Sequence, residues 1–175
     1  MNILFISSEI VPFASTGGLG DVCAALPNTL SDNKNNIIRM MPLYGFINKS
    51  KHNIVDLNLT IKINFADMCF YGKVYKQEHK NLITYFIQSN DFFDRDGIYG
   101  DEYGDFKDNF QRFLFFQKSV VYLIDLLKLK IDVVHCNDWQ SALIPLFLKF
   151  GINGSSRICN ERSLLTIHNI AHQGI

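Results

Sequence analysis

The chain has 175 residues, 47% of them hydrophobic, which is enough for one domain with a substantial core. Seventeen Lys and Arg balance seventeen Asp and Glu, so the concentrated positive charge that nucleic-acid binding requires is missing. No stretch reaches the roughly eighteen uninterrupted apolar residues of a membrane helix, and no two cysteines form a C-x-x-C pair. The sequence therefore predicts a cytoplasmic protein with reduced thiols and with no nucleic-acid or membrane partner.

The first part of the chain predicts a strand, a glycine-rich loop, a helix and a second strand. Residues 2–7 form a short apolar run that is typical of a strand buried on both faces of a parallel sheet. The loop TGGLG follows at 16–20, and apolar residues recur at helical spacing over 21–33. Pro27 is expected to kink this helix or to interrupt its hydrogen bonding. The run 36–42 ends in a proline and predicts the second strand.

The middle of the chain predicts strands that are antiparallel or mixed. Residues 57–65 and 69–87 alternate apolar and polar side chains in places, and turns are expected near Ala66–Asp67 and Glu78–Asn81. The glycines and aspartates of the following segment, 90–105, exclude a long regular element there.

The last part of the chain returns to alternating helices and strands. A helix is expected over 106–127, with Asp105 as its N-cap. Its expected buried face consists of Phe106, Phe110, Phe113, Gln117, Val120, Ile124 and Leu127. A strand over 131–138, a helix over 139–150 and a strand over 163–169 follow.

This order of elements predicts the fold class. Strands that alternate with helices over short connections favour a doubly wound, mostly parallel Rossmann-like α/β sheet, here with a few antiparallel strands inserted. The whole chain, 1–175, is expected to form one domain. Because no helix follows the last strand, we expect this domain to be truncated at its C-terminal end.

The first strand, loop and helix together suit an anion. Ligands of parallel α/β sheets bind beyond the carboxyl ends of the strands, and Gly17, Gly18 and Gly20 allow a ligand to approach the backbone closely. The first turn of the helix adds unpaired N–H groups and partial positive charge. A diphosphate is the expected ligand, and a tight turn that binds nothing explains the loop equally well. The pattern matches neither G-x-x-x-x-G-K-[ST] nor G-x-G-x-x-G.

Four segments resemble the family of bacterial glycogen synthases and plant starch synthases. They are SSEIVPFASTGGLGDV (7–22), FFDRDGIYG (92–100), VVHCNDWQSALIPLFLK (133–149) and TIHNIAHQG (166–174). They occur in the family's order over nearly the whole chain. The resemblance implies the N-terminal half of a two-domain GT-B glycosyltransferase, with the C-terminal donor-binding domain absent from this chain.

The resemblance also implies an activity and a set of site residues. The activity is the transfer of glucose from ADP-glucose to the non-reducing end of an α-1,4-glucan, with retention of configuration and without a metal or cofactor. The implied donor-phosphate residues are Ser15, Thr16, Gly17, Gly18 and Leu19. The implied catalytic residues are Asp138 and His168, and the implied substrate- and acceptor-binding residues are Glu9, Asp21 and Trp139.

The chain departs from the family at one of these positions. Where the family has K-T-G-G-L, this sequence has Ser15, whose hydroxyl brings no charge to a phosphate. Losing a charge-assisted contact costs roughly 2–4 kcal/mol of transition-state stabilisation. Ser15 and the missing second domain therefore also favour a different hypothesis, a non-catalytic glucan-binding or regulatory module.

The sequence also allows a different enzyme class, structural roles for three of these residues and a metal site to be considered. A dinucleotide-binding domain of an oxidoreductase is disfavoured by the missing third glycine and by Arg39 where an acidic ribose partner is expected. His135 is interpreted as a hydrogen-bonded structural histidine, Asp138 as a possible cap of the helix that begins near Trp139, and Glu9 as a residue that orients the loop. The aspartates of the polar loop do not follow the spacing of an EF-hand, so no metal site is expected there.

Overall fold

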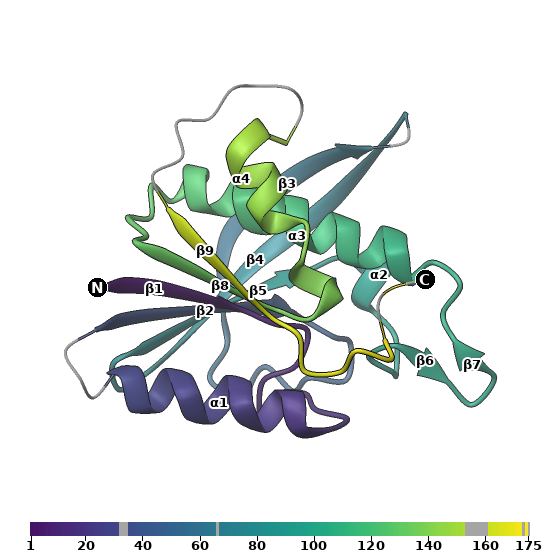
Figure 1. The fold of residues 1–175 in the computed structure, drawn as a ribbon. Helices are drawn as coiled ribbons and strands as arrows, with labels where there is room; N and C mark the ends of the chain where they lie inside the picture. Colours follow the sequence, from purple (N-terminus) through teal and green to yellow (C-terminus); the bar gives the residue numbers. More distant parts are fainter. Residues whose placement is uncertain (32–34, 66, 153–160, 173, 175) are drawn as a thin grey trace.

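A central seven-stranded sheet organises the computed structural model, which describes residues 1–31, 35–65, 67–152, 161–172 and 174 (Figure 1). The strand order is β3-β4-β5-β2-β1-β8-β9. The strands are β1 (Asn2–Ile6), β2 (Asn36–Pro42), β3 (Val55–Phe65), β4 (Met68–His79), β5 (Leu82–Gln88), β8 (Val133–Asn137) and β9 (Arg162–Thr166). Strands β5, β2, β1, β8 and β9 are mutually parallel, whereas β4 is antiparallel to both β3 and β5.

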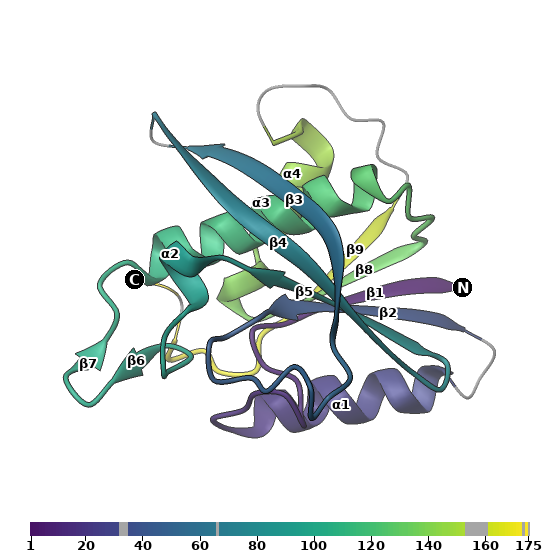
Figure 2. The same ribbon diagram turned by 180° about the vertical axis from the view of Figure 1, so that it is seen from behind.

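Helices cover both faces of this sheet. They are α1 (Gly18–Ser31), α2 (Asn90–Phe93), α3 (Asn109–Leu126), the 3-10 helix η1 (Trp139–Ser141) and α4 (Ile144–Phe150). Helix α1 lies on one face, and α3 and α4 lie on the other (Figures 1 and 2). A small hairpin, β6 (Gly100–Asp101) with β7 (Gly104–Asp105), stands apart from the sheet. The predicted doubly wound, mostly parallel sheet with inserted antiparallel strands is confirmed.

Helix α3 supplies much of the core, but it is shorter than expected. Phe113 and Val120 are fully buried and Ile124 is 1% exposed, and each such side chain stabilises the fold by about 1.5–3 kcal/mol. Phe110 is 55% exposed, so its assignment to the buried stripe was wrong. The helical period was right from Phe113 onward, and Phe110, the first residue of the stripe that lies in α3, faces solvent.

The predicted start of α3 and its cap were also wrong. The helix begins at Asn109 with Asp108 at the N-cap, and Asp105 belongs to β7. The backbone explains the delay, because the N–H of Phe106 donates to the Tyr99 carbonyl at 2.9 Å and holds that segment against the preceding loop. A contact between residues that are distant in the loop therefore overrides the local helical pattern.

Prolines account for two further differences. Helix α1 begins inside the predicted loop and continues through Pro27 without a break. The predicted end of this helix, at 32–33, lies outside the described residues. Ala66, which belongs to a predicted turn, also lies outside them. The helix expected over 139–150 is divided into η1 and α4, and Pro145 lies in the first turn of α4. Proline suits the first turn of a helix because its missing N–H has no partner there.

The outer parallel strand, β9, has apolar side chains in solvent. Leu164 is 51% exposed and Leu165 is 40% exposed, although neighbouring residues of a strand point to opposite faces. Strand β9 pairs with β8 along one edge.

Within the described part of the chain, no helix is long and apolar enough to span a membrane.

Candidate active site

The parallel strands place the predicted site residues at one edge of the sheet. Strand β1 pairs with β2 on one side and with β8 on the other, so the chain reverses its direction of winding between β1 and β8. Ligands bind outside the carboxyl ends of the strands at such a switch point. Glu9 follows β1, Asp138 follows β8 and His168 follows β9. The start of α1 and the β6–β7 hairpin lie at this same edge (Figures 1 and 2).

Glu9 is buried and fastens the glycine-rich loop. Its side chain is 3% exposed. One carboxylate oxygen accepts the backbone N–H of Thr16 at 2.5 Å, and the other accepts the Thr16 hydroxyl at 3.0 Å. The hydroxyl of Tyr99 donates to that second oxygen at 2.6 Å. Both oxygens of Glu9 therefore have protein partners, which favours the loop-orienting interpretation of this residue.

The glycines of the loop differ in what surrounds them. A Cβ atom at Gly20 would lie 2.6 Å from the Ser15 hydroxyl oxygen, so close packing inside the protein requires that glycine. Among the described residues, Cβ atoms at Gly17 and Gly18 would meet nothing within 4 Å. Neither of these two glycines has a positive φ. Neither packing against the described residues nor backbone conformation therefore requires glycine at these two positions.

Ser15 and Asp21 flank this loop on the surface. Both side chains are exposed, and the Ser15 hydroxyl donates to the Gly17 carbonyl at 2.9 Å. Asp21 lies in the first turn of α1, where a carboxylate is favourable beside the positive end of the helix dipole. Leu19, the remaining predicted phosphate-binding residue, is half-buried and packs against the core.

Asp138 and His168 come together at the ends of β8 and β9. The backbone N–H of His168 donates to Oδ1 of Asp138 at 2.7 Å. The imidazole Nε2 of His168 lies 2.9 Å from Oδ1 of Asn137, and the side-chain amide of Asn137 donates to the Ile6 carbonyl at 3.1 Å. His168 is exposed, yet Asn137 holds its ring and Asp138 holds its backbone N–H.

The backbone of Asp138 is strained. Its φ is 56° and its ψ is −178°, a combination that costs a residue with a side chain of order 1–3 kcal/mol. Asp138 occupies the N-cap position of η1, but its carboxylate makes no capping hydrogen bond. The interpretation of Asp138 as a side-chain cap was therefore wrong, and the carboxylate fastens the segment that carries His168.

Trp139 is packed on more than one side. Its indole meets the Phe113 ring edge-on at 5.2 Å between centroids. A Cβ atom at Gly174 would lie 2.6 Å from the indole, so the backbone of that glycine covers part of the ring. The indole is half-buried. In this structure the ring supports the end of β8 and the segment after β9 at the site.

His135 is a structural residue, as interpreted. It is 8% exposed, and its Nε2 lies 2.8 Å from the Thr166 hydroxyl. Burial, with a smaller contribution from His168, lowers the pKa of His135 below its usual value. The neutral imidazole therefore links β8 to β9 beneath the site.

Cys23, in the second turn of α1, lies near the carboxylates on both sides of the switch point. Burial raises the pKa of the Cys23 thiol to about 11, and the charges of Asp138 and Glu9 add to this effect. The thiol is 2% exposed. Cys23 is therefore a protonated packing residue, and the carboxylates of Asp138 and Glu9 lie within electrostatic range of one helix turn.

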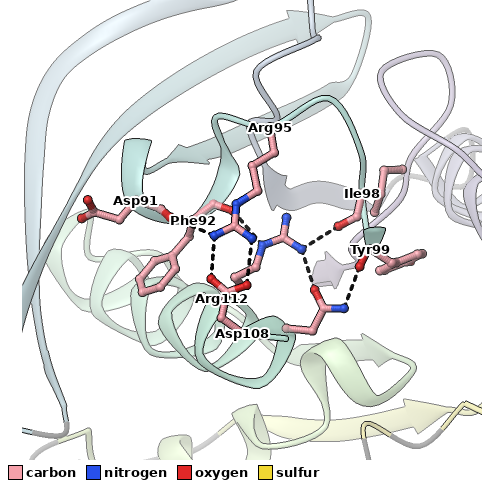
Figure 3. Close-up of polar contacts among 8 residues, drawn as sticks. Asp91, Phe92, Arg95, Ile98, Tyr99, Asp108 and Arg112 are labelled. Carbon is pink, nitrogen blue, oxygen red and sulfur yellow. Dashed lines mark hydrogen bonds and ion pairs between the residues drawn. The ribbon is translucent and has the colours of Figure 1, made fainter. Parts of the chain in front are cut away.

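Two arginines fix the segment between α2 and α3 (Figure 3). The guanidinium of Arg95 donates to both carboxylate oxygens of Asp108, at 2.8 and 2.6 Å. Arg112 is fully buried and donates to the carbonyls of Phe92 at 2.7 Å and Ile98 at 2.9 Å. The sequence predicts only that Arg112 belongs to the helix expected over 106–127, because nothing in the local pattern indicates that its side chain turns toward the core.

Two further residues of the site were missed. Tyr99 and Asn137 hold Glu9 and His168, respectively. Each lies inside a segment that carries the family resemblance, next to residues that were singled out. Their position within those segments was the available signal, and their partners come from distant parts of the chain.

The fold and this edge define a doubly wound α/β domain whose glycine-rich loop and buried carboxylates lie together at the switch point. The family profile of the starch synthase catalytic domain matches residues 2–175, and the chain belongs to this family. A glycogen synthase of Fusobacterium nucleatum is 38% identical over 175 residues, which cover 99% of this chain and 36% of that protein. A glycogen synthase of Geotalea uraniireducens is 35% identical over 100% of this chain and 36% of its own length.

Solved structures agree with this assignment. The catalytic domain of starch synthase IV from Arabidopsis thaliana, bound to ADP and acarbose, superposes with a TM-score of 0.84 at 27% identity over 99% of this chain and 35% of that chain. A trehalose-6-phosphate protein of E. coli, bound with UDP-2-fluoro glucose, shares the fold alone, with a TM-score of 0.50 at 10% identity over 96% of this chain and 33% of that chain. The chain spans about a third of the length of the curated relatives it matches. The family assignment replaces the oxidoreductase interpretation.

Proposed function

We propose that this chain is the N-terminal catalytic part of a glycogen or starch synthase, a hexosyltransferase that transfers glucose from ADP-glucose to the non-reducing end of an α-1,4-glucan with retention. The observation that carries the proposal is the pair Gly17 and Gly18, whose missing side chains leave open space at the switch point. The glycogen synthases among the relatives and the ADP of the starch synthase IV structure support the choice of substrates.

The donor diphosphate is assigned to the start of α1. Backbone N–H groups in the first turn of a helix have no partner within the helix and carry partial positive charge. Gly17, Gly18 and Leu19 supply this backbone, and the exposed, uncharged hydroxyl of Ser15 lies beside it with its proton donated to the Gly17 carbonyl. Thr16 holds the loop in place through Glu9. Fixed amide donors of this kind stabilise the charge that develops on a departing diphosphate. The proposal involves no metal or cofactor.

The transferred sugar is assigned to the ends of β8 and β9. His168 presents an exposed imidazole whose Nε2 is held by Asn137. Asp138 fixes the backbone of His168 by accepting its N–H. These groups are suited to hydrogen bonding with sugar hydroxyls. Asp21, exposed on the first turn of α1, is assigned to the acceptor glucan. Trp139 supports the end of β8 and the segment after β9 through its packing on Phe113 and Gly174.

We also infer the place of the chain in the complete enzyme. Residues 1–175 form its N-terminal Rossmann-like domain, and a C-terminal donor-binding domain completes the active site. The relatives, of which this chain covers 36%, support this arrangement. The exposed leucines of β9 support a further packing layer over that strand, because strands of parallel sheets are normally covered on both faces.

A glucan-binding module without transferase activity is the second candidate. The observation in its favour is Ser15, which brings no charge to the loop. The two functions differ in one measurement, the incubation of the complete protein with ADP-glucose labelled in the glucose and with glycogen. Label that enters the glucan, and is released by an α-1,4-specific hydrolase, supports the synthase. Retention of the protein on glycogen without incorporation of label would contradict it and favour the binding module.

A further inference from the structure

We propose that Arg112 is a positioning residue for the glycine-rich loop and acts through Tyr99 and Glu9. The proposal rests on the function proposed above, in which the loop holds the donor diphosphate. Arg112 belongs to α3, which lies on the face of the sheet opposite to α1 (Figure 1). Among the described residues, its side-chain hydrogen bonds go to Phe92, Ile98 and Asn109 and not to the glycine-rich loop. Its influence on the loop passes through a series of hydrogen bonds, none longer than 3.0 Å.

The first step joins Arg112 to the segment that carries Tyr99. The guanidinium binds the carbonyls of Phe92 and Ile98, and its Nη1 also donates to Oδ1 of Asn109 at 2.6 Å. The side-chain amide of Asn109 in turn donates to the Tyr99 carbonyl at 2.7 Å. Arg112, directly and through Asn109, thus fixes the peptide groups on both sides of Tyr99.

The surroundings of Arg112 suit this task, and its guanidinium also lies over the rings of Phe93, Phe106 and Phe113 at 4.7–5.6 Å from their centroids. The side chain is fully buried, it donates hydrogen bonds to no carboxylate among the described residues, and its second terminal nitrogen has no hydrogen-bond partner there. Burial lowers the pKa of Arg112 to about 10, so the group remains charged near neutral pH. A buried cation without a carboxylate partner is costly. Its hydrogen bonds to the carbonyls of Phe92 and Ile98 indicate that the buried charge serves to fix the backbone between α2 and α3.

The second step joins Tyr99 to Glu9. The phenol donates to Oε1 of Glu9 at 2.6 Å and lies 2.7 Å from the Ser8 hydroxyl. Burial raises the pKa of Tyr99 well above its ordinary value, so the phenol keeps its proton and its role as a donor. Its ring packs on Phe113 at 5.9 Å between centroids, and this packing does not need the hydroxyl.

The last step joins Glu9 to the loop. Its carboxylate accepts both the N–H and the hydroxyl of Thr16, which directly precedes the open pair Gly17 and Gly18. A carboxylate that loses the Tyr99 hydroxyl has more freedom to move, and Thr16 moves with it. A displacement of about 1 Å in a group that positions a substrate can cost about a hundredfold in rate.

The test uses the complete protein that contains this chain and two variants. Arg112→Lys replaces the planar fork with a single ammonium that cannot bind both carbonyls in the same geometry, and Tyr99→Phe removes only the hydroxyl. Tyr122→Phe, which removes a partly exposed hydroxyl from the same helix as Arg112, and Arg162→Lys, on the exposed edge strand, are the matched controls.

The first readout is amide hydrogen exchange of the peptide spanning 14–20, with the peptide of β1 as reference. We expect faster exchange at 14–20 in both variants, by about tenfold, and no change in β1 or in the controls. The second readout is kinetic: kcat/KM for the sugar nucleotide falls by about tenfold or more, whereas KM for the glucan stays within about twofold. A purely structural role would affect both substrates alike.

The outcomes separate this inference from the proposed function. Unchanged exchange at 14–20 in Tyr99→Phe overturns the inference, even where Arg112→Lys loosens its own loop or fails to fold. An equal loss toward donor and glucan overturns it as well. Absence of glucose transfer in the unmodified protein contradicts the proposed function, and the exchange measurement still decides the role of Arg112.

Discussion

Two glycine-containing loops meet at the same edge of the sheet and use glycine for opposite reasons. In the loop before α1, Cβ atoms at Gly17 and Gly18 would lie in open space. In the loop before α3, a Cβ at Gly97 would lie 1.8 Å from the Gly100 carbonyl oxygen, and one at Gly100 would lie 2.3 Å from that of Gly104. The second loop needs glycine to fold upon itself, whereas the first keeps its backbone accessible from outside.

This difference separates residues that build the site from residues that are left free for a ligand. Arg95, Arg112 and Asp108 fasten the packed loop with charged groups at its base (Figure 3). The open loop is fastened from beneath, by Glu9, and the described part of the chain leaves the Cβ positions of Gly17 and Gly18 free. Sequence motifs mix the two kinds of residue, and only the surroundings of each side chain distinguish them.

The largest expected effect on stability is in the packed loop. Gly97→Ala forces a methyl group against backbone, and overpacking of this kind costs up to about 3 kcal/mol. Urea denaturation followed by circular dichroism measures the loss. Gly18→Ala is the matched control, for which we expect a change within about 0.5 kcal/mol. Equal destabilisation by the two substitutions would remove the distinction between the loops.

The open loop responds in activity instead. Gly18→Ala places a methyl group where the donor phosphates are proposed to approach, so we expect kcat/KM for the sugar nucleotide to fall by roughly tenfold to a hundredfold. Initial rates of glucose incorporation into glycogen provide the measurement. A variant with native stability and native kcat/KM would show that no ligand approaches this glycine.

A smaller change in the opposite direction is expected at position 15. Ser15→Lys adds a charge beside the loop, and we expect turnover with ADP-glucose to rise by about tenfold, less than for a buried contact because the position is exposed. Ser15→Gln, which adds length without charge, is the control. Turnover that stays the same in the lysine variant would mean that the missing cation does not limit the rate.

The smallest expected effect is on the pH dependence of stability and concerns His135, one of the residues that build the site. Its pKa is lowered by burial, so above the ordinary value of about 6.5 both the folded and unfolded states are neutral at this residue. As the pH falls below that value, the unfolded state takes up the proton first, and stability decreases. Urea midpoints between pH 7.5 and 5.5 should therefore fall more in the unmodified protein than in His135→Gln. The same pH slope in both would contradict this role.

Local patterns were sufficient for much of the fold. Apolar runs predicted the parallel strands, and the alternation of elements predicted the doubly wound sheet. The patterns failed where a distant contact decides the structure. The Tyr99 carbonyl binds the N–H of Phe106 and delays the start of α3, and Phe110 then faces solvent although the helical period includes it.

The site was predictable in its members but not in their connections. Glu9, Asp138 and His168 were singled out through resemblance to a family, and the structure adds the partners that hold them. Tyr99 reaches Glu9 across ninety positions of sequence separation, and no local spacing encodes such a contact. The strained φ of 56° at Asp138 is equally invisible in the sequence, because aspartate is common in unstrained turns.

The central claim is that the open backbone at the start of α1 receives the diphosphate of the donor. A crystal structure of the complete protein with ADP and a maltooligosaccharide tests it most directly. The account predicts phosphate oxygens at about 3 Å from the backbone nitrogens of Gly17 and Gly18, with Glu9 still bound to Thr16. A nucleotide bound elsewhere, with this loop closed over by side chains, would contradict it.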